Sequence, residues 1–323
     1  MSDRMRPISF ERMVNWIIGE VKAKGSIYGI HSDKIYYSKP ENTITFLGET
    51  LGIPIGPAAG PNSQLAQNIV AAYLTGSRFI ELKTVQTLDG EDLPVSKPCI
   101  NAEDECYNVE GSTELRGEEA YEEYVKGWFL MHLLQRELGI SDEKDFMFNM
   151  SVGYDLEGIK SNKINSFIEN LKDGSNTAIW KQCVQVLEDN LSEFTHFDKE
   201  ALESISPKIC SSITLSTLHG CPPAEIERIA TYLLKEKNLN TFIKMNPTLL
   251  GEKFVRNTFK DMGYGYIELN PHHFKNDLKY DDGIAMLKRL RKIAKEEGLN
   301  IGVKLTNTLP VKILNKELPG EEM

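Results

Sequence analysis

Short apolar runs alternate with amphipathic helical segments along most of this chain, and that alternation restricts the folds open to it. Most of the runs lack a regular apolar–polar alternation, as is typical of strands buried on both faces. Strand, helix and strand in succession predict a parallel sheet. The expected strands are Gly52–Ile55, Arg78–Val85, Asp145–Val152, Cys210–Leu218, Thr241–Asn246, Tyr264–Leu269 and Asn300–Thr306.

Amphipathic segments between the strands predict the helices that cover the sheet. Apolar residues recur at helical spacing near 65–73, 226–234 and 284–293. A helix is also expected at Phe10–Lys24, and a long one from about Glu118 to Leu138. Seven strand–helix units favour a (β/α) barrel over an open doubly wound sheet.

The expected strands fall short of the number that closes a barrel, which is about eight. The last strand signal ends near Thr306, and a polar tail follows it. We therefore expect an α/β fold of the (β/α)8 TIM-barrel type, truncated before its last strands. The expected organisation is an N-terminal helical extension at 1–50 and an incomplete barrel at 51–323, with a loop–helix insertion at 86–144.

Composition excludes several classes of function. The 323 residues include 37 Lys and Arg against 47 Asp and Glu, giving a net charge of −10. Nucleic acids and anionic membranes are therefore unexpected partners, because both attract positive fields. No stretch reaches the ~18 apolar residues of a membrane helix, and no secretory signal opens the sequence. The five cysteines form no Cys-x-x-Cys pair, so we expect no metal site and a reducing, cytoplasmic location.

Lysines stand near the ends of three expected strands, where a barrel carries its chemistry. Lys83, Lys244 and Lys304 lie among apolar residues, and a buried unpaired charge is costly. Together they predict a barrel mouth that holds an anion. A salt bridge across the mouth is the alternative for Lys83, and a Schiff-base lyase is a further one. The candidate hydrogen-bonding groups beside the lysines are Asn246, Asn307 and Thr308.

Cys221 joins the fourth expected strand to the helix that begins near Pro222. A cysteine at a helix N-terminus meets the positive end of the helix dipole, and the nearby His219 could further favour the thiolate. Cys221 is therefore a candidate nucleophile or general acid/base. The alternative is a small residue at the start of the helix.

Two loops add further candidates. Gly56–Gly60 contains small residues that would let a flat ring approach the backbone, although a tight turn explains them as well. The long loop after the second expected strand contains Asn108 and Glu110. These side chains could face a ligand, since loops of that length often bind, or they could lie in a solvated acidic turn.

Five segments together resemble the flavin barrel of dihydroorotate and dihydropyrimidine dehydrogenases, and more closely the N-terminal part of selenate reductase subunits. They are Pro57–Gly60, Glu81–Thr84, Ser216–Pro222, Ile243–Pro247 and Lys304–Thr308. The resemblance implies a flavin-dependent oxidoreductase module of a larger electron-transfer enzyme, with FMN at the barrel mouth. FAD and 4Fe–4S clusters belong to family regions that this sequence does not include.

The resemblance also implies roles for residues of this sequence. Cys221 and Lys83 would be catalytic, with the cysteine exchanging the proton that accompanies hydride transfer. A small-molecule substrate or redox partner would react there. The implied FMN contacts are Ala58, Ala59, Gly60, Lys83, Thr84, Lys244 and Asn307, and the implied substrate contacts are Asn108, Asn246, Asn307 and Thr308.

The sequence also departs from the family. The motif around Cys221 contains an insertion relative to the dehydrogenases, and the last strands with their flavin-phosphate loop are missing. An alternative is therefore a non-catalytic assembly domain that docks iron–sulfur or molybdenum partners.

Overall fold

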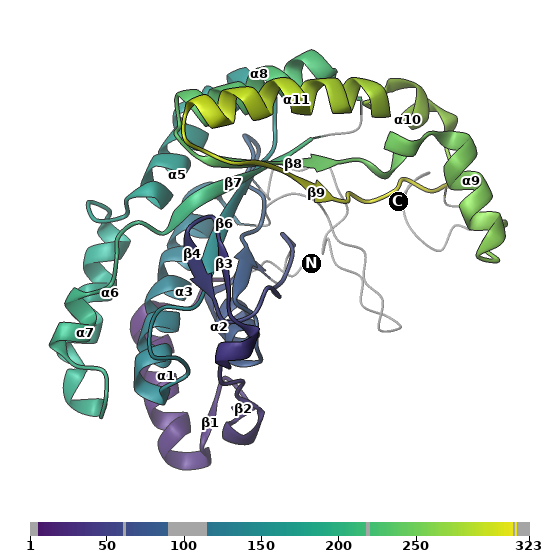
Figure 1. The fold of residues 1–323 in the computed structure, drawn as a ribbon. Coiled ribbons are helices and arrows are strands. Elements are labelled where there is room, and N and C mark those ends of the chain that lie inside the picture. Colours follow the sequence, from purple (N-terminus) through teal and green to yellow (C-terminus); the bar gives the residue numbers. More distant parts are fainter. Residues whose placement is uncertain (1–5, 61–62, 90–114, 218–219, 313, 315–323) are drawn as a thin grey trace. The chain divides into compact units, whose positions relative to one another are not determined.

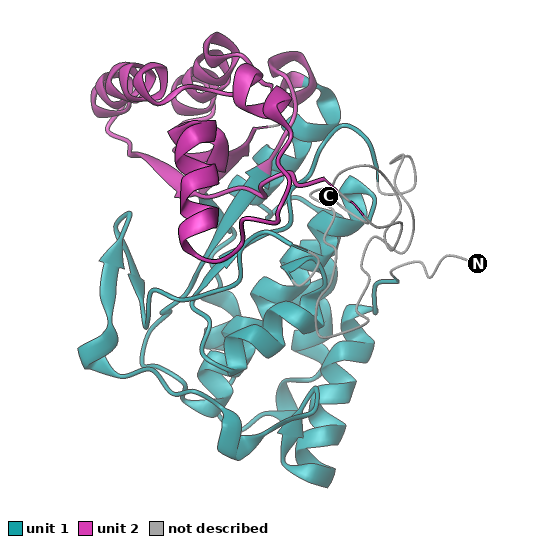
Figure 2. Ribbon diagram, turned by 90° about the vertical axis from the view of Figure 1, so that its right-hand side faces the viewer, with its two compact units in different colours: residues 1–94, 109–151, 161–211 teal, residues 95–108, 152–160, 212–323 magenta. Residues whose placement is uncertain are grey.

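The structure is a computed structural model that divides into two compact units (Figure 2). Unit 1 comprises residues 1–94, 109–151 and 161–211, and unit 2 comprises 95–108, 152–160 and 212–323. The residues that it describes are 6–60, 63–89, 115–217, 220–312 and 314.

Unit 1 opens with helix α1 (Phe10–Lys24), whose bounds match the predicted helix. Ser9 begins the helix, because its side chain accepts a hydrogen bond from the Arg12 N–H, and Gly25 ends it with a positive φ of 61°. Two small antiparallel hairpins follow, one of β1 (Ser26–Ile27) and β2 (Ile30–His31), the other of β3 (Ile44–Phe46) and β4 (Glu49–Leu51).

The parallel strands of unit 1 are β5 (Phe79–Glu81) and β6 (Met147–Val152), with Glu81 beside Asn149. Every residue of β6 is buried. The unit is mainly helical, and α3 is its longest helix; the helices are α2 (Ala66–Leu74), α3 (Gly117–Leu138), α5 (Asn162–Lys172), α6 (Ala178–Asp189) and α7 (Lys199–Glu203).

The prediction of a strand at Gly52–Ile55 is wrong, although this segment does run against β5. The Ile55 carbonyl accepts hydrogen bonds from the N–H groups of Arg78 (2.7 Å) and Phe79 (3.1 Å). Pro54 has no N–H to donate, so a regular ladder cannot form there. The two segments lie so close at Gly56 that a Cβ atom on this residue would lie 1.5 Å from the Phe79 carbonyl oxygen.

Unit 2 contains most of β7 (Cys210–Ser216) together with β8 (Asn240–Met245) and β9 (Ile301–Leu305). These strands are parallel and adjacent in that order. Figure 1 shows α8 and α11 side by side along the strands. The helices of the unit are α4 (Leu156–Lys160), α8 (Pro223–Lys235), α9 (Glu252–Asp261), α10 (Pro271–Asn276) and α11 (Tyr280–Glu296).

The prediction of a strand at Tyr264–Leu269 is also wrong. Helix α9 ends in a turn at Gly263, where φ is 85°. After the turn, Ile267 and Leu269 pack in a local cluster with Val255 and Phe274 instead of entering the sheet, while Tyr264 and Tyr266 are exposed. Leu269 forms only an isolated bridge, to Val311. Only part of the apolar run is therefore buried, and it is buried in this small cluster.

A buried arginine ties together separate segments of unit 1. The Arg78 side chain is fully buried, and its Nε lies 2.8 Å from Asp145 Oδ2. Its other guanidinium nitrogens donate to the backbone carbonyls of Tyr73 (2.8 Å), Ser77 (2.9 Å) and Tyr36 (3.1 Å). The guanidinium also lies over the Tyr73 ring, 4.3 Å from its centroid. One cation thus joins the end of α2 to the segment that precedes β6.

Candidate functional site

The predicted site residues divide between the two units. Ala58, Ala59, Gly60, Lys83 and Thr84 belong to unit 1. Asn108 and Glu110 lie outside the described residues. The predicted residues of unit 2 are Cys221, Lys244, Asn246, Asn307 and Thr308.

In unit 1 the small-residue turn is held against the end of β5. The Ala59 N–H donates to Glu81 Oε2 (2.8 Å), and the Glu81 N–H donates to the Pro57 carbonyl (3.1 Å). Glu81 is buried, while Ala58 is exposed, and Ala59 and Gly60 are half-buried. The backbone of this turn is thus fixed and still open to a ligand.

Lys83 and Thr84 follow β5 at its carboxyl end. The Lys83 side chain is 1% exposed, and its carbonyl accepts a hydrogen bond from the Tyr124 hydroxyl (3.0 Å). The Leu82 N–H bonds to the Asn149 carbonyl (2.9 Å) and the Val85 N–H to the Ser151 carbonyl (3.0 Å). The chain therefore advances three residues, from Leu82 to Val85, while β6 advances two, from Asn149 to Ser151. A bulge of this kind redirects side chains at the end of a strand.

Sequence reasoning missed the polar residues of β6 that adjoin this strand end. Ser151 Oγ lies 2.8 Å from Thr84 Oγ1, and Asn149 is the register partner of Glu81. Both β6 residues are 1% exposed. The signal was present, because polar residues two apart in an otherwise apolar buried strand share one face. Buried polar groups of this kind are hydrogen-bonded, and at a strand end they also serve sites.

In unit 2 the strand ends form a continuous polar row. Ser216 is the register partner of Lys244, and Lys244 is the partner of Lys304. Register partners in a parallel sheet point their side chains to the same face. Lys244 and Lys304 are both half-buried. Two ammonium groups therefore share one face near the carboxyl ends of neighbouring strands, which favours an anionic ligand there.

An amide pair lies directly beyond this row. Asn307 Nδ2 donates to Asn246 Oδ1 (2.9 Å), and Asn307 Oδ1 accepts from the Thr308 N–H (2.9 Å). The Thr217 hydroxyl donates to the Lys244 carbonyl (2.8 Å) and holds the end of β7 against β8. The structure thus brings the predicted residues of this group together, and their roles stay predictions.

The expectation of a thiolate at Cys221 is wrong. Cys221 does precede the N-terminus of α8, but burial raises the pKa of its thiol to about 11, and the nearby Glu225 carboxylate adds to the rise. Glu225 lies in the first turn of α8, where its negative charge offsets the positive end of the helix dipole that would otherwise favour a thiolate. His219 lies outside the described residues. Cys221 is therefore protonated at neutral pH, which suits a proton donor better than a nucleophile.

We expect the alkylation of Cys221 by iodoacetamide to be slow at pH 8 and to accelerate up to about pH 11. Because only the thiolate reacts, a pKa two units above the usual 9 leaves about a hundredfold less reactive species. Peptide mass spectrometry would assign the labelled cysteine, with Cys221→Ser as the blank. Glu225→Gln should move the profile to lower pH; a profile centred on pH 9 or below in the unaltered chain would contradict the assignment.

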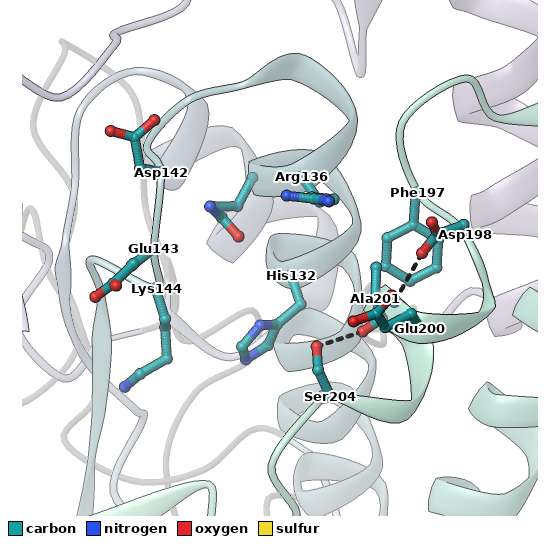
Figure 3. A pocket seen from close by; sticks show the side chains of 11 residues that line it. His132, Arg136, Asp142, Glu143, Lys144, Phe197, Asp198, Glu200, Ala201 and Ser204 are labelled. Carbon is teal, nitrogen blue, oxygen red and sulfur yellow. Dashed lines mark hydrogen bonds between the residues drawn. The ribbon is translucent and has the colours of Figure 1, made fainter.

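A cavity of about 410 Å³ lies in unit 1, at the end of β6 opposite Ser151. It is lined by the segment before β6, by α3 and by residues near α7 (Figure 3). His132 lies at its floor, and burial together with Lys144 lowers the His132 pKa to about 3. No predicted site residue lines this cavity. In a β/α barrel the amino ends of the strands carry stability and the carboxyl ends carry chemistry, so the cavity does not compete with the candidate site.

No group of three or more His, Cys, Asp or Glu residues among those that the structure describes is arranged to hold a metal ion. No helix within the described part of the chain is both long and apolar enough to cross a membrane.

The chain is similar to proteins of one known family. Residues 28–323 match the family described as the oxidoreductase YgfK N-terminal TIM-barrel domain. Two curated proteins, provisionally named oxidoreductase YgfK, come from Escherichia coli K12 and O157:H7. Each is 48% identical over 335 residues, which cover 100% of this chain and 32% of the relative. The chain thus spans about a third of the length of these relatives.

A solved structure also aligns, that of the ligand-free type DHODH from Eimeria tenella. It is 13% identical, the alignment covers 91% of this chain and 82% of that one, and the TM-score is 0.40. At this score the likeness supports no inference. The family match confirms the predicted TIM-barrel class, and the family carries the name of an oxidoreductase. None of these names mentions selenate.

Proposed function

The chain belongs to the family of the YgfK oxidoreductase N-terminal TIM-barrel domain, and we propose that it is an FMN-binding module of a larger electron-transfer protein. The observation that carries this proposal is the row of Lys244 and Lys304 on one face of neighbouring strands, with the Asn246–Asn307 amide pair beyond it. Cations and amides in this arrangement suit a flat ring that gains negative charge on reduction.

The residues present fit a flavin. Open backbone at Ala58–Gly60 leaves room for a flat ring. Lys244 and Asn307 of unit 2 would hold the cofactor, and contacts from Lys83 and Thr84 are implied by the sequence resemblance alone. FMN would supply hydride transfer when bound. The proposed domain limits are an N-terminal extension at 1–50 and a barrel at 51–323 with a loop–helix insertion at 86–144.

Cys221 would handle the proton of the reaction. Its raised pKa keeps the proton on Sγ at neutral pH, so the thiol would pass this proton only to a more strongly basic atom of the substrate. Asn108, Asn246, Asn307 and Thr308 would orient a small substrate or electron acceptor. The finer proposal, that the longer protein passes electrons through iron–sulfur or molybdenum partners and toward selenate, is supported only by the sequence resemblance.

The proposal is tested by flavin binding. We expect the purified chain to carry flavin absorbance, or to quench the fluorescence of added FMN with a saturable, one-to-one curve. Riboflavin serves as the matched ligand, because it has the same ring without the phosphate. A folded, colourless protein that ignores both ligands would contradict the proposal and favour the assembly-domain alternative.

A further inference from the structure

A buried carboxylate links the two turns that carry candidate residues of unit 2. We propose that Asp277 is a positioning residue that fixes the turn bearing Cys221 against the turn that follows β8. The inference rests on the proposed role of Cys221 in proton transfer. Asp277 lies directly after α10, is 4% exposed, and does not belong to the residues predicted from sequence.

The two carboxylate oxygens of Asp277 serve two different turns. Oδ1 accepts a hydrogen bond from the Gly220 N–H (2.6 Å), immediately before Cys221. Oδ2 accepts a hydrogen bond from the Thr248 hydroxyl (2.5 Å). Thr248 is 3% exposed and lies in the short helix Pro247–Leu250 after β8. Hydrogen bonds to a charged, buried acceptor are the strong ones. The carboxylate therefore joins two turns that no strand pairing reaches.

The backbone at Gly220 shows why the turn needs such a partner. Gly220 has a φ of 83°, a conformation that residues other than glycine rarely adopt. A flexible glycine gives the turn no side chain with which to pack, and the residue is exposed. Its N–H bond to Asp277 is thus a direct restraint on the position of the neighbouring Cys221 backbone. Without that restraint the thiol would leave its half-buried position beside Glu225.

The test is the reactivity of the Cys221 thiol in Asp277→Asn. Asparagine keeps the size of the side chain but replaces one acceptor oxygen with a donor, which cannot serve both turns. We expect the alkylation rate of Cys221 at pH 8 to rise about tenfold, the effect of a pKa one unit lower, and the pH profile to shift down accordingly. Thr248→Val, which removes one of the two donors, should shift the profile in the same direction by less.

Two matched variants serve as controls. Asp281→Asn is the control for Asp277→Asn and changes an exposed carboxylate in the first turn of α11. Thr231→Val is the control for Thr248→Val and removes a hydroxyl within α8. Neither should alter the Cys221 profile. Leu290→Ala destabilises unit 2 through its buried core and reports what a general loss of stability does to the thiol.

The inference is overturned if Asp277→Asn folds like the unaltered chain and leaves the alkylation profile unchanged, or if Leu290→Ala shifts the profile equally. The measurement needs no flavin. A failure of FMN binding would therefore count against the proposed function and leave this result standing, while an unchanged thiol profile in a flavin-binding chain would count only against Asp277.

Discussion

Replacing Arg78 with methionine is expected to lower the free energy of unfolding by about 3–5 kcal/mol, because it leaves the Asp145 carboxylate buried without its charge partner. The loss also removes donors from the carbonyls of Tyr36, Tyr73 and Ser77. Denaturant unfolding followed by far-UV circular dichroism would measure it. Arg78→Lys should give an intermediate loss, since a lysine keeps the charge but cannot reach all the acceptors.

The matched control is Arg289→Met. Arg289 also pairs with a carboxylate through two nitrogens, both 2.7 Å from Glu227 oxygens, but the pair lies at the surface. Solvent screens such pairs, so its removal should leave the unfolding midpoint nearly unchanged. Equal losses from the two substitutions would show that burial does not set the effect and would contradict the prediction.

The core of the fold could be read from the sequence because apolar spacing reports burial directly. Helix α1 lies where its helical spacing predicts it, and strands β6, β8 and β9 lie within the predicted apolar runs. The failures have a common physical cause, since a short apolar run does not by itself show that its residues enter a sheet: Ile55, Tyr264 and Tyr266 are exposed. Ile267 and Leu269 pack in a local cluster, and Gly52–Ile55 lies against β5 without completing a ladder.

The candidate site was predictable in its residue types and not in its electrostatics. The position of Lys244 and Asn307 near strand ends followed from the strand prediction. In the structure the strand register places Lys244 beside Lys304, and a hydrogen bond joins Asn307 to Asn246. The pKa of Cys221 depends on burial and on Glu225, neither of which sequence spacing reveals. Asp277 was missed for the same reason, because its partners are distant in sequence and one of them is a backbone N–H.

A Lys244→Met, Lys304→Met double variant is expected to bind FMN roughly a hundredfold more weakly than the unaltered chain. The two half-buried ammonium groups share one face of the strands, and each hydrogen bond from a charged group contributes about 1.5–3 kcal/mol. The loss of two such hydrogen bonds would raise the dissociation constant for FMN by a factor of a hundred or more. Methionine keeps much of the length of the lysine side chain, so the packing of the stems is retained. Fluorescence titration with FMN measures the change.

The charge-matched control is Lys288→Met, Lys292→Met, which removes the same two charges from exposed positions on α11. If the change in net charge alone governed the binding of the anionic cofactor, both double variants would weaken binding equally, and raising the salt concentration would remove the difference from the unaltered chain. If the strand-end row holds the ring, only the Lys244 and Lys304 variant loses affinity, and it loses affinity for riboflavin as well as for FMN. Loss for FMN alone would instead assign these lysines to the phosphate, and unchanged binding of both ligands would remove the row from the site.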